Sequence, residues 1–168
     1  MPIDITVEDG SIVEDANSYI NVDDVREFAA NRGVALPESD DDVAILILKA
    51  MDYLEGFRDQ FQGTRTEGRE QALQWPRADV QIDGFDVDDD EIPVELRNCV
   101  AQLCMEQYAN GLNLTPTVGA FVTEEKVGPI TVKYSEMVRT MGLPVIASIQ
   151  AWLDALTGLS ATIKTIRV

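Results

Sequence analysis

The segment from Ser39 to Phe57 most constrains the fold, because its pattern predicts a helix that is apolar on most sides. Ser39 is followed by three aspartates, and a capping side chain followed by acids favours a helix N-terminus. A helix with so wide an apolar surface is either buried centrally or shared with another subunit. We therefore predict self-association through this helix, at Leu46, Ile47 and Tyr53.

Three further helices are predicted from caps and apolar spacing. One begins after Asn21 and stops near Gly33, one runs from 93 to 111, and one from 144 to 158. The residues expected to face the core in the last two are Leu96, Cys99, Val100, Leu103 and Tyr108, and Val145, Ile146, Ile149, Trp152, Leu153 and Leu156.

The remaining segments complete a single predicted domain, residues 1–168. Residues 58–92 lack a sustained period and predict a long protruding loop. Residues 118–134 contain two β-prone runs broken around 124–128, which suggests a small hairpin. The predicted fold is mainly α: a four-helix bundle-like domain with a small β-hairpin, a long protruding loop and an extended C-terminal tail at 159–168.

Within the long loop, Trp75, Pro76 and Arg77 predict an anchor, since proline restricts the residue before it to extended geometry. The acidic stretch that follows comprises Asp86, Asp88, Asp89, Asp90 and Glu91. It faces a channel or the next subunit in one hypothesis and is a solvated turn in the other. A calcium loop fits poorly, because Glu91 stands at the position that requires glycine and Arg97 at that of the bidentate glutamate.

Two blocks carry the whole charge imbalance of this chain, whose net charge is −17. Residues 1–42 hold 12 acids and 2 bases, and residues 79–95 hold 8 acids and no base. Such a field repels DNA, although Arg58, Arg65, Arg69 and Arg77 gather around the long loop.

Catalytic chemistry is not expected. The chain has no histidine, which is the commonest general base and transition-metal ligand, and it lacks the phosphate-binding glycine motifs. Cys99 and Cys104 lie about 140° apart around a helix, so they are expected to be buried free thiols. We expect no enzyme activity, no cofactor, no metal site and no membrane span.

Several stretches in order resemble one known family: "VEDGSIVEDANSYINVDDVREFAANRG", "AMDYLEGF", "LQWPRADV" with "EIPVELRNCVAQLC", and "EEKVGPITVKYSE". Together they resemble the head–tail connector (adaptor or neck) proteins of tailed bacteriophages, some relatives of which are labelled DnaT-like single-stranded-DNA-binding proteins. The resemblance implies a structural virion protein, assembled in the host cytoplasm and located in the virion neck. It implies a ring of about twelve copies between the portal and a tail nozzle, tube or head-closure protein. Duplex DNA would pass through without specific binding.

The C-terminal segment "LSATIKTIRV" is too apolar for a solvated end and should pair with another chain or lie in a partner's groove. Packing on its own domain is the alternative. The resemblance points to the portal as its partner. The residues expected to make the contact are Leu159, Ile163, Lys164, Ile166, Arg167 and Val168. The alternative function, single-stranded-DNA binding, fits the acidic charge poorly.

Overall fold

The computed structural model describes residues 2–114, 124–127, 130–133 and 143–158. Its helices are α1 (Val22–Ala30), α2 (Asp40–Glu55), α3 (Val94–Asn110) and α4 (Gln150–Thr157), the last preceded by a 3₁₀ turn, Ala147–Ile149. Its strands are β1 (Thr64–Arg65), β2 (Arg77–Ala78), β3 (Val80–Ile82), β4 (Phe85–Val87), β5 (Glu124–Val127) and β6 (Ile130–Lys133). Within these ranges the strands form three antiparallel pairs, β1–β2, β3–β4 and β5–β6.

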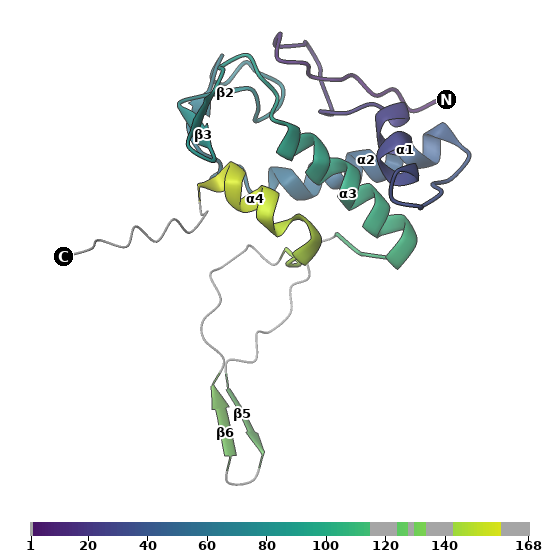
Figure 1. The fold of residues 1–168 in the computed structure, drawn as a ribbon, viewed down its shortest axis with the longest axis vertical. Helices are drawn as coiled ribbons and strands as arrows, with labels where there is room; N and C mark the ends of the chain where they lie inside the picture. Colours follow the sequence, from purple (N-terminus) through teal and green to yellow (C-terminus); the bar gives the residue numbers. More distant parts are fainter. Residues whose placement is uncertain (1, 115–123, 128–129, 134–142, 159–168) are drawn as a thin grey trace, which may run out of the picture.

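Helix α3 is central, since α1, α2 and α4 all contact it (Figure 1). The chain is therefore mainly helical with small antiparallel hairpins, as the sequence predicts. A four-helix bundle is a finer description that these contacts do not establish. Among the described residues, no helix is long and apolar enough to cross a membrane.

The predicted helix starts are confirmed by their caps. The side chain of Asn21 accepts a hydrogen bond from the Asp24 amide, and that of Ser39 accepts one from the Asp42 amide. Helix α3 follows Pro93, and Gly111 ends it in the left-handed conformation. Gly33 adopts the left-handed conformation expected of it, with a φ of 74°, two residues beyond the α1 cap at Asn31.

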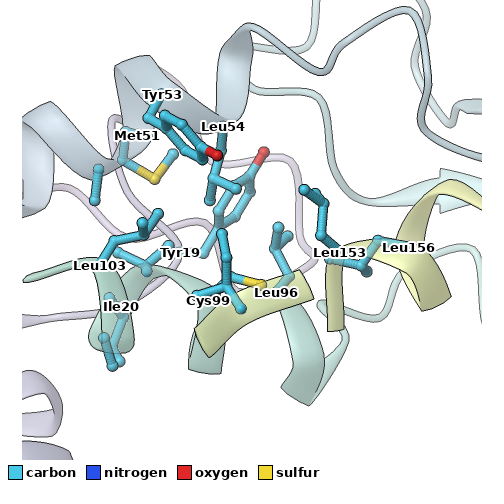
Figure 2. Packing of buried hydrophobic residues seen from close by; sticks show 14 of the residues in the cluster. Tyr19, Ile20, Met51, Tyr53, Leu54, Leu96, Cys99, Leu103, Leu153 and Leu156 are labelled. Carbon is cyan, nitrogen blue, oxygen red and sulfur yellow. The ribbon is translucent and has the colours of Figure 1, made fainter. Parts of the chain in front are cut away.

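The core forms between α2, α3 and α4 (Figure 2). Two positions expected to face inward are wrong: Tyr108 is 49% exposed and Val145 is 60% exposed. On α3 the inward position is taken by Gln107, whose amide donates to the carbonyl oxygens of Leu46 and Leu103. Val145 precedes the 3₁₀ turn, so helical spacing does not govern it.

The self-association residues on α2 are corrected by their burial. Ile47 is 0% and Tyr53 2% exposed, and Figure 2 shows Tyr53 among the core side chains. The Tyr53 hydroxyl donates to the carbonyl oxygen of Pro144, 2.8 Å away. Leu46 is partly buried against the same core. The breadth of the apolar surface is thus explained by packing against α3, α1 and the segment at Leu143 and Pro144, which leaves Ile47 no surface for another subunit and Tyr53 only 2%.

The prediction of a protruding loop at 58–92 is also wrong. This segment contains β1 to β4, and Phe61, Trp75, Val80, Ile82 and Ile92 within it are buried in the core. Strands of two or three residues are too short to leave a period in the sequence, which is why the segment resembles a loop.

The predicted hairpin is present as β5–β6, with Val127 opposite Ile130. The expected break at 124–128 is misplaced, since residues 124–127 form the first strand. The tail residues Leu159, Ile163, Lys164, Ile166, Arg167 and Val168 lie outside the described residues.

Candidate functional site: an acidic face on a rigid frame

Trp75 fixes the middle of the 58–92 segment to the core. Its side chain is fully buried, with its ring edge-on to Phe61 at a centroid distance of 5.8 Å. Its backbone amide donates to the hydroxyl oxygen of Tyr19, 3.1 Å away, and the peptide bond to Pro76 is cis. Burial raises the pKa of Tyr19 well above its usual range. Trp75 and Pro76 are therefore internal positions, consistent with the predicted anchor.

Arg77 completes this anchor through the backbone. Its Nε donates to the carbonyl oxygen of Gln62 at 2.6 Å, Nη2 to that of Gly63 at 2.8 Å, and Nη1 to that of Gln74 at 3.2 Å. Burial lowers the pKa of this guanidinium. A planar, five-donor group can bridge three carbonyls at once, so Arg77 ties the start of the segment to its middle.

Gln71 also holds the backbone of this segment, and it was not among the residues predicted from the sequence. Its side chain is buried, its amide donates to the carbonyl oxygens of Leu73 and Pro76, and its own oxygen accepts from the Glu67 amide. No motif or spacing marks such a residue before the backbone path is known.

Glu8 organises the N-terminal segment in a similar way. This buried carboxylate accepts hydrogen bonds from the backbone amides of Gly10, Ile12 and Val13 at 2.9 to 3.0 Å. Ile12 adopts a φ of 62°, a conformation that a β-branched residue rarely takes. The neighbouring Asp9 accepts from the hydroxyl and amide of Ser11, and these bonds lower the pKa of Asp9.

The N-terminal segment lies directly against the acidic stretch. A Cβ on Gly10 would stand 1.8 Å from the carbonyl oxygen of Asp90, so only glycine allows this approach. A cavity of about 460 Å³ lies at the junction. Six acids line it, named here the acidic face: Glu8, Asp9, Asp24, Asp88, Asp90 and Glu91.

The fold thus brings the two acidic blocks of the sequence together. Val7, Tyr19, Ile92 and Arg97 line the same cavity, so one base faces six acids there. Of the stretch predicted to face a channel or subunit, Asp86 and Asp89 do not line this cavity. Asp86 instead accepts from the Gln81 side chain, and the Asp89 backbone carbonyl from the Thr66 hydroxyl.

The arginines that the sequence placed around this segment serve different roles. Arg77 and Arg65 donate to backbone carbonyls, and Arg58 pairs with Glu55 at 3.0 Å. Elsewhere, Arg26 pairs with Asp40 at 2.8 Å. Within the described part of the chain, no group of three or more acidic or cysteine side chains is arranged to hold a metal ion. Cys99 and Cys104 are buried free thiols, as predicted.

Fold and site together define a small, mainly helical protein with an acidic face. The segments that carry this face are held by side chains hydrogen-bonded to the backbone. Residues 3–168 match the model of a family described as "Putative DnaT-like ssDNA binding protein", and the chain belongs to that family. No curated protein and no solved structure matches the chain. The family description agrees with the single-stranded-DNA-binding hypothesis rather than with the connector.

Proposed function

We propose that this chain is a structural, non-enzymatic protein that assembles around a DNA path, as a head–tail connector of a tailed bacteriophage. The observation that supports this proposal is the acidic face, which joins acids from 8–24 with acids from 88–91 around one cavity. The Glu8 carboxylate is held there by three backbone amides, and the backbone of Asp90 lies against Gly10.

A fixed negative surface suits a passage for DNA. Duplex DNA carries one negative charge per ~1.7 Å of its axis, and binding needs bases that displace its counterions. Carboxylates facing this charge give repulsion that acts over a Debye length of about 8 Å at physiological salt. A channel lined in this way would let the duplex slide without adhering.

The connector hypothesis also assigns partners to the chain. Copies would form the ring, the portal would accept the tail residues 159–168, and a tail nozzle, tube or head-closure protein would bind the other side. Deleting residues 159–168 should leave helix content unchanged and abolish joining to the portal. A truncated chain that unfolds would instead assign this segment to the core.

Single-stranded-DNA binding is the second candidate, and the family description favours it. Such binding combines a basic groove with aromatic side chains on which bases stack. Phe85 and Tyr108 are exposed aromatics, but Phe85 lies between Asp83 and Asp86 in the chain. Most arginine contacts described above are with the chain's own carbonyls and carboxylates, so we rank this function second.

One assay separates the two functions. Fluorescence anisotropy with labelled single-stranded and duplex oligonucleotides at about 150 mM salt, where screening extends about 8 Å, should give dissociation constants weaker than ~10 µM. Replacing Asp88, Asp90 and Glu91 by their amides should strengthen binding of both, because it removes three repelling charges. Submicromolar affinity of the unmodified chain for single strands would establish the second function instead.

A further inference from the structure

The β3–β4 hairpin carries the most exposed large apolar side chain described in this structure. Phe85 is 76% exposed and follows the two-residue turn Asp83-Gly84, whose φ angles are 54° and 85°. Two consecutive positive φ values fit the twist of a tight hairpin, and an Asp-Gly pair favours such a turn. The aromatic ring is therefore presented on a preorganised support.

Phe85 extends an apolar surface beyond the chain's own core. It stands opposite Ile82, and Val87 stands opposite Val80, so these four side chains lie on one face of the hairpin. Val80 and Ile82 are buried, and Val87 packs against the same core. The apolar face of the hairpin is therefore buried at Val80 and Ile82 and exposed at Phe85.

A partly apolar cavity lies elsewhere on the same chain. It has a volume of about 260 Å³, and four of its lining side chains are polar or charged: Lys49, Asp52, Gln107 and Asn113. Its apolar side chains are Tyr53, Leu112, Leu114 and Leu143, and Lys49 and Asp52 of α2 lie at its edge. Aromatic anchors that enter such pockets dominate many protein interfaces.

The charges around the two features are complementary. Asp83 and Asp86 flank Phe85 and are exposed, and Asp86 is held by the Gln81 amide at 2.7 Å. Lys49 is exposed at the cavity and offers the opposite charge. Asp52 opposes this attraction, so the apolar contact must provide most of the free energy of association.

The hairpin is held in place on its own chain, because its Val80 and Ile82 are buried in the core. In Figure 1, β3 and the C-terminal end of α3 lie on opposite sides of the body. The partner that fits is therefore a second copy. A contact between different surfaces of identical chains is head-to-tail, and such contacts close into rings when the rotation permits.

We propose that Phe85 of one copy inserts into the cavity formed by Lys49, Tyr53, Leu112, Leu114 and Leu143 of the next. This inference rests on the ring assembly of the proposed function and names the residues that join its subunits. It replaces Leu46 and Ile47 as the self-association surface and keeps Tyr53 only as part of the cavity wall.

The test uses two variants of the full chain, measured by sedimentation velocity up to about 1 mM. Phe85→Ala removes the inserted ring, and Lys49→Trp fills the cavity entrance from an exposed helical position. Each variant alone should associate at least tenfold more weakly than the unmodified chain. An equimolar mixture should form dimers and nothing larger, because one copy keeps a hairpin and the other keeps a cavity.

Tyr108→Ala is the matched control, since it truncates another exposed aromatic that does not line the cavity. It should assemble as the unmodified chain does. The inference is overturned if Phe85→Ala assembles normally, if the mixture stays monomeric, or if the unmodified chain is monomeric throughout. The oligonucleotide assay tests the proposed function independently, so the failure of one is distinguishable from the failure of the other.

Discussion

Arg77 offers the sharpest test of how the 58–92 segment is held. Replacing it by methionine keeps an apolar stem of similar length and removes all three donors to the carbonyl oxygens of Gln62, Gly63 and Gln74. The segment would then keep its apolar contacts through Trp75 while losing its main backbone tie.

The expected cost follows from these contacts. A hydrogen bond from a charged group contributes ~1.5–3 kcal/mol, so three give a gross loss of roughly 4.5–9 kcal/mol. Two effects reduce it: burial of the guanidinium, seen in its lowered pKa, is no longer needed, and the exposed Gly63 can bind water instead. We expect the free energy of unfolding to fall by about 3 kcal/mol.

Urea denaturation followed by far-ultraviolet circular dichroism measures this loss. Arg77→Lys should recover less than half of it, because an ammonium is a point charge that cannot bridge three carbonyls. Arg69→Met is the control, an exposed arginine of the same segment, and should change stability by less than about 0.5 kcal/mol. If the Arg77→Met protein is as stable as the control, the three hydrogen bonds of Arg77 do not stabilise the segment.

Three further predictions follow from buried groups. Burial raises the pKa of Cys99 and Cys104 to about 12, so thiol reagents at pH 8 should modify them only at the rate of unfolding. The same thiols ionise near pH 9 when unfolded, so the free energy of unfolding should be unaffected by them below that pH and fall between about pH 9 and 12, as urea titrations would show. Glu8→Gln should destabilise the chain by ~1–3 kcal/mol in thermal unfolding, since an amide NH₂ must face the amide of Gly10, Ile12 or Val13; an unchanged melting temperature would contradict this.

The helices could be predicted from the sequence because their signals are local. Asn21, Ser39 and Gly111 act on amides or carbonyls a few residues away, so a pattern suffices to find them. The failures are non-local. Tyr53 appeared available to a partner because its hydroxyl acceptor, the Pro144 carbonyl, lies 91 residues away in sequence.

The site illustrates the same division. The acidic stretch and the anchor residues were visible as composition and as a Trp-Pro-Arg motif, but their surroundings were not. Nothing in the sequence near Gly10 indicates that it packs against Asp90, or that Glu8 would face the same cavity as Glu91. Contacts of this kind depend on the whole chain path, which no local pattern encodes.

The contacts of the arginines also bear on DNA binding, which the family description names. The sequence offers Arg58, Arg65 and Arg77 as contacts for phosphate, but these side chains bind the chain's own carboxylate or carbonyl oxygens. A base that leaves its partners to contact phosphate loses those bonds, so its net gain is small. Exposed acids of the acidic face, such as Asp88 and Glu91, repel phosphate without first breaking such bonds. The arginines that the sequence offers for phosphate at the 58–92 segment are therefore largely engaged within the fold, which argues against a basic groove there.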